Sequence, residues 1–257
     1  MDIFYTLSGF AVGAIVGLTG VGGGSLMTPL LVLVFGVPAA TAVGTDLLYA
    51  AITKSGGTLV HARKGHVQWR ISGLLAAGSI PAAALTVWAI AQLPKHSPAM
   101  TQVISTALGI ALLLTALSII FRTKIQQHAL AHTDSANPKH RVPITIGVGA
   151  LLGVLVSISS VGAGALGIAA LFYLYPRLPA IRVIGSDVAH AVPLTLVAGV
   201  GHWMIGSVNW PLLGSLLLGS LPGIWLGSHA SAKVPERFLR PILASMLVLV
   251  GGKLIAF

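Results

Sequence analysis

The stretch "GVGGGSLMTP", residues 20–29, places four glycines within five positions of an otherwise apolar segment. In a soluble protein such a run would indicate a phosphate-binding loop. That interpretation fails here, because no Gly-Lys-Ser or Gly-Lys-Thr sequence follows the glycines and no soluble strand–helix–strand unit surrounds them. The sequence around the glycines therefore decides their meaning.

The composition of the chain is that of a membrane protein. Its 257 residues are 55% hydrophobic and 8% charged, whereas soluble domains carry about 25% charged residues. Asp, Glu, Lys and Arg are missing from three long stretches, 3–45, 143–176 and 188–232. A helix crosses the hydrocarbon core in roughly 20 residues, so each stretch can supply one or more spans. We therefore predict an all-α, polytopic membrane protein.

Charge and cysteine content exclude several kinds of site. The chain has no cysteine, so it can hold no disulfide, thiolate metal site or thiol nucleophile. Its net charge of +10 would indicate nucleic acid in a soluble protein, but here the basic residues lie in short loops, where they set orientation. The amino terminus carries no Lys or Arg before its first apolar run, so we interpret it as a retained segment and not a cleaved signal peptide.

The second half of the chain repeats the first at an offset of about 140 residues. The matched positions extend over some forty residues and pair these motifs: Val21–Leu26 with Val161–Leu166, Gly44-Thr45-Asp46 with Gly185-Ser186-Asp187, His61 with His202, Gly65–Trp69 with Gly206–Trp210, and Ser79-Ile80-Pro81 with Ser220-Leu221-Pro222. A match of this length indicates duplication.

Each half divides into five apolar segments. They are predicted at 3–19, 25–36, 40–60, 71–91 and 100–121 in the first half, and at 143–158, 164–175, 182–202, 211–228 and 241–256 in the second. The domain boundaries follow as a first repeat over 1–121, a cytoplasmic linker over 122–142 and a second repeat over 143–257.

The second segment of each half is about a dozen residues long and follows a Gly-rich break, so it is too short to span comfortably. We predict a broken helical hairpin that either re-enters or spans. Each half then crosses the bilayer three or five times. Both counts are odd, so the two repeats have inverted topology.

The basic residues support that inversion, because they favour opposite members of matched loop pairs. Twelve of the fifteen fall on one side, which we assign as cytoplasmic: Arg63, Lys64, Arg70, Arg122, Lys124, Lys139, Arg141, Arg177, Arg182, Lys233, Arg237 and Arg240. Both termini then lie outside.

Inverted repeats with interrupted helices are typical of secondary transporters, whose binding site lies where the repeats meet. A broken helix exposes unpaired N–H groups at its new N-terminus, which attract anions. The residues predicted to bind substrate at the two breaks are Gly22, Gly23, Gly24, Ser25, Ser160, Gly162 and Gly164. The alternative is that the glycines serve close helix packing, which we favour for Gly9, Gly13 and Gly17 at four-residue spacing.

Ionisable side chains within spans are costly and tend to line functional cavities. Asp46 and Asp187 occupy matched positions, each preceded by a hydroxyl residue, Thr45 or Ser186, which we place in the substrate site. The alternative for both aspartates is a structural role at a helix N-terminus.

Two further ionisable residues lie near the aspartates. Lys54 lies two turns beyond Asp46 and can contact an anionic substrate or Asp46 itself, or snorkel towards the cytoplasm. His190, three residues after Asp187, can relay protons or act as a structural donor. We assign proton coupling to Asp46, Asp187 and His190.

Other features carry less chemistry. The linker histidines, His128, His132 and His140, are irregularly spaced and are read as a solvated loop, so no metal or cofactor is predicted. The matched prolines Pro81 and Pro222 would kink helices and could serve as hinges. No Ser-His-Asp or HExxH arrangement occurs, so we predict that the chain is not an enzyme.

The sequence resembles one transporter family. The motifs "GFAVGAIVGLTGVGGGSLMTPLLVLVFGVPAATAVGTDLL" and "GGTLVHARKGHVQW", with the degenerate second copy "SSVGAGALGIAAL", "VIGSDV" and a following Trp, resemble the TauE/SafE family of bacterial sulfite or organosulfonate exporters. The resemblance covers Gly9 to Phe257. It implies a proton- or ion-coupled secondary transporter in the bacterial inner (plasma) membrane. The implied substrates are small sulfur oxyanions such as sulfite, sulfoacetate or other sulfonates, often moved outward.

The resulting prediction is a secondary active transporter of small sulfur-containing anions that works by alternating access. Its predicted partners are a small anionic substrate and the lipid bilayer, with no nucleic acid. A second copy of the chain, in a homodimer, is a further candidate partner. An anion channel or uncoupled permease is the first alternative. An intramembrane enzyme or a signalling subunit is the second.

Overall fold

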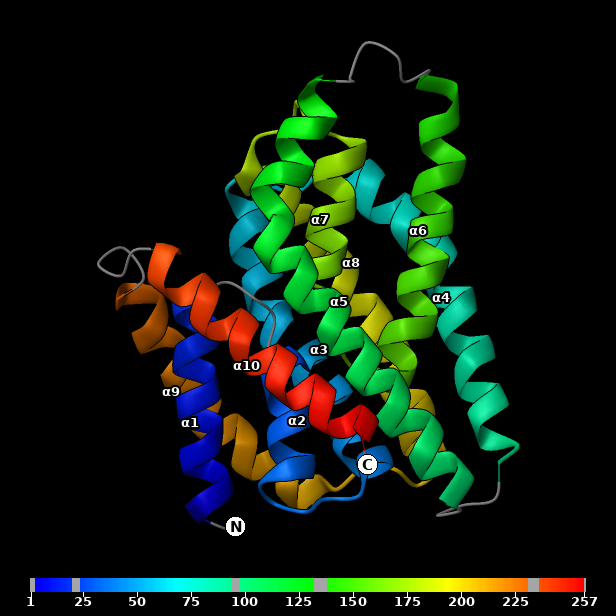
Figure 1. Ribbon diagram of the computed structural model, residues 1–257, viewed down its shortest axis with the longest axis vertical. Helices are drawn as coiled ribbons and strands as arrows, with labels where there is room; N and C mark the ends of the chain where they lie inside the picture. The colour runs from blue at the N-terminus through cyan, green and yellow to red at the C-terminus, as the bar shows by residue number, and fades with distance from the viewer. Residues whose placement is uncertain (1–2, 20–23, 94–97, 132–137, 231–235, 257) are drawn as a thin grey trace.

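The computed structural model describes residues 3–19, 24–93, 98–131, 138–230 and 236–256. Within these residues every regular element is an α-helix, which confirms the predicted all-α class. The helices are α1 (Ile3–Thr19), α2 (Gly24–Leu33), α3 (Ala39–Arg63), α4 (Trp69–Ala91), α5 (Pro98–Ala131), α6 (Pro138–Ser159), α7 (Ala165–Leu174), α8 (Ala180–Met204), α9 (Trp210–Ala230) and α10 (Glu236–Ala256) (Figure 1).

Five of these ten helices contain a stretch long and apolar enough to cross a membrane. They are α4, α5, α6, α8 and α9. The short helices α2 and α7 have ten residues each and so measure about 15 Å, half of the hydrocarbon thickness. The arrangement is that of a polytopic membrane protein.

The helices α5 and α6 are longer than the apolar segments predicted for them. The predicted segments end at 121 and begin at 143, whereas α5 continues to Ala131 and α6 begins at Pro138. Residues 122–131, "RTKIQQHALA", contain neither Gly nor Pro. Nothing in this polar stretch therefore stops the helix where its apolar part ends.

Helices α3 and α8 occupy matched positions in the two halves, have 25 residues each, and begin and end in the same way. Pro38 and Pro179 stand at their N-caps with φ of −52° and −56°. Gly65 and Gly206 follow their C-caps with φ of +68° and +81°, a conformation that favours glycine. In both turns the next N–H donates back to a histidine carbonyl, that of His61 or His202, which completes a Schellman motif.

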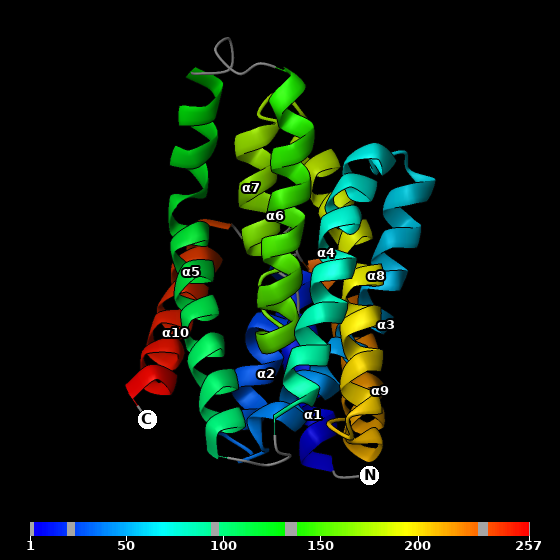
Figure 2. The same cartoon turned by 90° about the vertical axis from the view of Figure 1, so that its right-hand side faces the viewer.

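Helices of the first half pair with helices of the second. α1 packs along α9, α4 along α6, α3 along α8, and α5 along α10 (Figures 1 and 2). α3 also contacts α2, α5, α6 and α9, while α8 contacts α4, α6 and α7. The helices that carry the two aspartates therefore cross at the centre of the molecule.

Glycines allow two of these pairs to approach closely. A Cβ on Gly9 would lie 2.4 Å from the Leu216 carbonyl oxygen of α9, and a Cβ on Gly149 would lie 2.2 Å from the Leu75 carbonyl oxygen of α4. Gly13 meets the backbone of Ser220 in the same way. The predicted packing role of Gly9 and Gly13 is thus confirmed, and the same contact recurs at matched positions of the two halves.

Several connections between helices lie at one of two ends of the molecule. The α3–α4 and α7–α8 turns lie at the end of the molecule where α5 finishes and α6 begins. The N-terminus and the α8–α9 turn lie at the opposite end (Figure 2). The basic residues of the α3–α4 and α7–α8 turns therefore share one end of the structure.

Candidate functional site

The second Gly-rich break interrupts the helical backbone between α6 and α7. Ser160, Gly162 and Gly164 have φ of +58°, +125° and +134°. Glycine adopts such angles at no steric cost, whereas serine does so rarely. The whole break is buried, with Ser160 only 5% exposed. Its backbone is therefore surrounded by protein, as a non-helical segment at membrane depth requires.

The first break is described only from its end. Gly22 and Gly23 lie outside the described residues, which resume at Gly24, the first residue of α2. Ser25 follows in the first turn and is buried. The substrate-binding role predicted for these residues stays a prediction.

The N-terminus of α7 forms one wall of the site. Gly164 stands at its N-cap, and no described side chain caps the helix by a hydrogen bond. The Gly167 N–H in the first turn donates to the Gly162 carbonyl oxygen of the break at 3.2 Å. Ser118 of α5 donates to the Ala165 carbonyl oxygen at 2.9 Å. The start of a helix carries partial positive charge, so this wall favours an anion.

Lys54 reaches this wall from α3. Its Nζ donates a hydrogen bond to the Ala163 carbonyl oxygen in the break at 2.8 Å. An ammonium group has three hydrogens to donate, so this bond leaves two for other acceptors. Lys54 also lies within electrostatic range of Asp46 and Asp187. One cation of the first half is thus held against the break of the second half.

Asp46 is buried at the junction of α3 and α2. Thr28 Oγ1 of α2 donates to Asp46 Oδ2 at 2.5 Å, and Ser160 of the second break is a further neighbour of this carboxylate. Asp46 Oδ1 and the Ser160 hydroxyl have no hydrogen-bond partner among the described residues. Asp46 therefore ties α2 to α3 through one of its two oxygens.

Asp187, the matched aspartate of α8, has different surroundings. It is fully buried, and neither carboxylate oxygen has a hydrogen-bond partner in the described part of the chain. Asp187 lies against the first turn of α7, where a Cβ added to Gly167 would be 1.9 Å from Oδ1. Gly167 is therefore needed to make room for the carboxylate.

Thr45 and Ser186 hold helix starts of the opposite half. The Asn209 N–H donates to Thr45 Oγ1 at 3.1 Å, and the Gln68 N–H donates to Ser186 Oγ at 2.9 Å. Asn209 and Gln68 immediately precede α9 and α4. Both hydroxyls are buried and engaged, so the structure places these residues in structural hydrogen bonds. Their predicted contact with substrate remains untested.

His190 forms a buried hydrogen bond with α4. Its Nε2 lies 2.8 Å from Ser79 Oγ, while its Nδ1 has no partner among the described residues. The matched position in the first half is Tyr49, which is buried near Ser220, the residue that matches Ser79. The two halves thus place a different polar side chain beside the same serine.

Several residues of the site were not predicted. They lie in apolar or repeat-matched stretches, and none of these residues was assigned a role: Thr28, Tyr49, Ser79, Ser118 and Gly167. Thr28 could have been found as a polar residue within "GSLMTPLL". Ser79 could have been found from its match with Ser220, but nothing in the spacing indicates that it meets His190.

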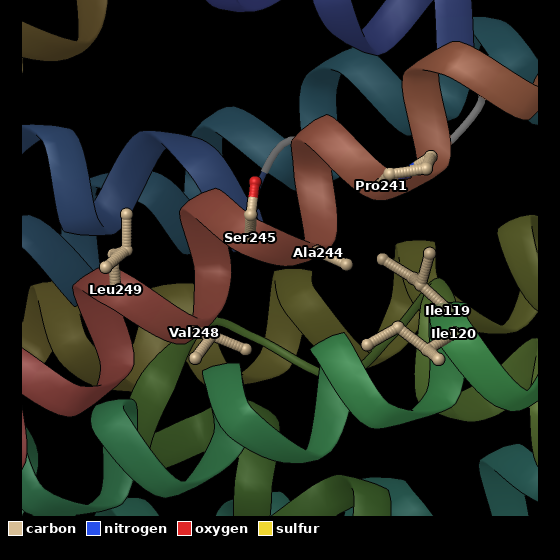
Figure 3. A pocket seen from close by; sticks show the side chains of 7 residues that line it. All are labelled: Ile119, Ile120, Pro241, Ala244, Ser245, Val248 and Leu249. Carbon is tan, nitrogen blue, oxygen red and sulfur yellow. The ribbon is translucent and has the colours of Figure 1, made fainter.

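An apolar groove of about 610 Å³ lies elsewhere, between α5 and α10. Ile119 and Ile120 of α5 face Ala244 and Val248 of α10 across it (Figure 3). Ser245 is the one polar side chain among the residues that line it. Because the groove contains neither Lys54 nor an aspartate, it cannot serve the anion chemistry of the break.

Comparison with known proteins gives the family. The family model described as "Sulfite exporter TauE/SafE" matches residues 5–254. A probable membrane transporter protein of Bacillus subtilis, YjnA, is 39% identical over 256 residues, which are 99% of this chain and 100% of the relative. A second one from that organism, YdhB, is 28% identical and is covered to 97%, over 93% of this chain.

A more distant relative comes from an archaeon. The probable membrane transporter protein MJ0441 of Methanocaldococcus jannaschii is 25% identical over 95% of this chain and 91% of its own length. No solved structure matches the chain significantly. With the buried break, its cation and the apolar helices around them, these matches make the chain a multi-pass membrane transporter that belongs to the TauE/SafE family.

Proposed function

We propose that this transporter moves small sulfur-containing anions, such as sulfite, sulfoacetate or other organosulfonates, and binds them at the second break. Transport proceeds by alternating access, is coupled to protons or another ion, and serves export in the bacterial inner membrane. The family description, which names sulfite export, supports the substrate class and the direction.

The observation that carries the proposal is the contact between Lys54 and the break. Lys54 Nζ lies 2.8 Å from the Ala163 carbonyl oxygen, beside a helix start that no described side chain caps. A cation and a positive helix end together favour a small oxyanion. The break is buried, so the anion reaches it only after a movement of the surrounding helices, as alternating access requires.

We further propose that the two halves are inverted repeats. Matched contacts support this: α1 packs on α9 as α6 packs on α4. The hydroxyls of Thr45 and Ser186 cap matched helix starts across the halves. The basic α3–α4 and α7–α8 turns lie at the end of the molecule opposite the α8–α9 turn (Figure 2). Inverted repeats around a central site are a recurrent plan of secondary transporters.

The proposal is tested by a binding screen on the purified protein with sulfite, thiosulfate, sulfoacetate and taurine. Lys54→Ala is expected to weaken anion binding roughly tenfold or more, because it removes the cation that faces the ligand. The control is Lys253→Ala, which removes an exposed lysine in the last turn of α10. Equal, small effects of both changes would count against Lys54, and a neutral compound bound better than every anion would overturn the substrate class.

An uncoupled permease or channel would share the same anion site. The two are separated by proton flux into proteoliposomes that contain the protein. A coupled transporter moves protons only when the anion is present, and an uncoupled pathway moves the anion without them. If the anion moves without substrate-dependent proton movement and without dependence on another ion, the protein is a channel or uncoupled permease and not a coupled transporter.

A further inference from the structure

We infer that Asp187, and not its repeat partner Asp46, is the proton-binding group of this transporter, and that the proton and the anion cross the membrane in the same direction. This inference rests on the proposed anion transport. It distinguishes between two aspartates that the sequence repeat presents as equivalent.

Asp46 and Asp187 differ in the hydrogen-bond donors that face their carboxylates. Asp46 accepts a hydrogen bond from Thr28 Oγ1, which stabilises its ionised form. Asp187 accepts none from any residue that the structure describes, although it is completely buried. A buried carboxylate without donors is poorly stabilised as an anion, and taking up a proton removes the buried charge.

The ionisable side chains of the site set its net charge. Lys54 contributes one positive charge, and the ionised forms of Asp46 and Asp187 contribute two negative charges. We count His190 as neutral, because the side chain is fully buried and a second cation beside Lys54 would be costly there. The sum is one negative charge. One proton on Asp187 makes the site neutral and leaves Asp46 as the counter-ion of Lys54.

Helices α3, α4, α6 and α7 pack against α8 around Asp187. α3 presents Lys54, which also interacts with Asp46, and near its C-terminal end His61, whose Nδ1 would lie 3.3 Å from a Cβ on Gly185. α7 presents Gly167, and α6 presents Leu152, which lies beside the same glycine. α8 itself adds His190. The ionisable side chains described on α4, α6 and α7 are Arg70, Arg141 and Tyr173, which stand near helix ends. Lys54 is therefore the cation that links Asp187 to the anion site.

Proton binding at Asp187 and anion binding at Lys54 are linked. An anion bound at Lys54 and the α7 start adds negative charge beside Asp187, which strengthens proton binding there. Linkage is reciprocal, so a proton on Asp187 strengthens anion binding by the same factor. The form that carries both is favoured over the forms that carry one, which makes the proton a co-transported ion. The proton enters Asp187 from the side where the anion binds and leaves with it on the other side. In export, a divalent anion with one proton carries a net charge of −1, so the anion gradient and the inside-negative membrane potential drive the pair outward.

The test measures anion binding and proton uptake together on the full-length protein. Sulfoacetate and thiosulfate are used, because both are fully ionised near neutral pH and release no proton of their own. In weakly buffered solution, the wild type is expected to take up close to one proton per anion bound at alkaline pH. Its anion affinity should fall about tenfold per pH unit once Asp187 is ionised in the free protein.

Two isosteric variants separate the aspartates. Asp187→Asn fixes the neutral form, so it should bind the anion with an affinity that no longer depends on pH and with no proton uptake. Asp46→Asn should still take up a proton with the anion, but at lower pH than the wild type, because Asp187 then replaces Asp46 as the counter-ion of Lys54. Proton uptake that survives in Asp187→Asn and disappears in Asp46→Asn would overturn the inference.

The wild-type measurement keeps the inference testable if a variant does not fold. Anion binding without proton uptake at any pH between about 5 and 9 would also overturn it. Failure of both anions to bind the wild type would instead count against the proposed function. The two failures are therefore distinguishable.

Discussion

Thr45 and Ser186 show how a residue in a predicted site can serve the scaffold. Each offers its hydroxyl to the N–H of a residue that precedes a helix of the other half, Asn209 or Gln68. Ser186 also donates to the Arg182 carbonyl oxygen and accepts from Ser72 through its own carbonyl. These contacts join the two halves beside the aspartates.

We predict that Thr45→Val destabilises the protein without changing its anion affinity. The change leaves the Asn209 N–H without its acceptor, which costs about 1–2 kcal/mol. Thermal unfolding in detergent and anion titration measure the two effects separately. The control is Ser55→Ala, because Ser55 is an exposed residue whose hydroxyl, among the described residues, bonds to the Ala51 carbonyl of its own helix. A large loss of affinity at unchanged stability would instead place Thr45 in the substrate site.

The residues of the site were predicted from the sequence only in part. A charged or hydroxyl residue in an apolar span is visible in sequence, so Asp46, Lys54 and Asp187 could be singled out. Their partners could not, because Thr28 meets Asp46, and Gly167 meets Asp187, through the packing of separate helices. The repeat gave the two aspartates equal positions, and only the structure separates their surroundings.

At the scale of the helix, the close pairs depend on glycine. Gly13 of α1 lies against the Ser220 backbone of α9, as Gly153 of α6 lies against the Ser79 backbone of α4. Ser79 is also the partner of His190. The glycine contacts of α6 thus position a hydroxyl that reaches the centre of the molecule.

We predict that Gly13→Ala destabilises the α1–α9 pair. The new Cβ would lie 2.5 Å from the Ser220 carbonyl oxygen, so one helix must shift, at a cost of about 1–3 kcal/mol. Gly73→Ala in α4 is the control, because nothing lies within 4 Å of its Cβ, and removing a helical glycine stabilises by up to about 1 kcal/mol. Unfolding temperatures in detergent compare the two, and a Gly13→Ala protein as stable as Gly73→Ala would contradict the close approach.

Helix positions were predicted well, because apolar length and Gly or Pro signals decide them locally. Every predicted apolar segment overlaps one helix. The extension of α5 to Ala131 was not predicted, because hydropathy marks where the apolar part ends and not where the helix ends. The pairing of helices across the halves could not be read from hydropathy either, since apolar faces fit many neighbours equally.

At the scale of the whole molecule, the central question is the orientation of the two halves. The chain contains no cysteine, so single cysteines can be introduced without a background to remove. Lys64→Cys places one in the α3–α4 turn, and Met204→Cys places one before the α8–α9 turn. Both native side chains are exposed.

We predict that a membrane-impermeant thiol reagent applied to intact cells labels Met204→Cys and not Lys64→Cys. Lys64 lies in a basic turn that the charge distribution assigns to the cytoplasm, whereas the matched turn after Met204 carries no Lys or Arg. Permeabilised cells provide the control, in which both cysteines react. Labelling of both positions from the same side in intact cells would exclude the inverted arrangement.

The polarity of α3 has a consequence for how the protein is made. α3 is long enough to span, yet it is absent from the helices apolar enough to do so, whereas its counterpart α8 is among them. During synthesis α3 emerges well before α8. Asp46 already has its donor Thr28 in α2, whereas the acceptor of Lys54, the Ala163 carbonyl oxygen, belongs to the second half. The nascent first half must therefore wait, in the insertion machinery or at the lipid surface, until the ribosome has delivered the helix that shields it.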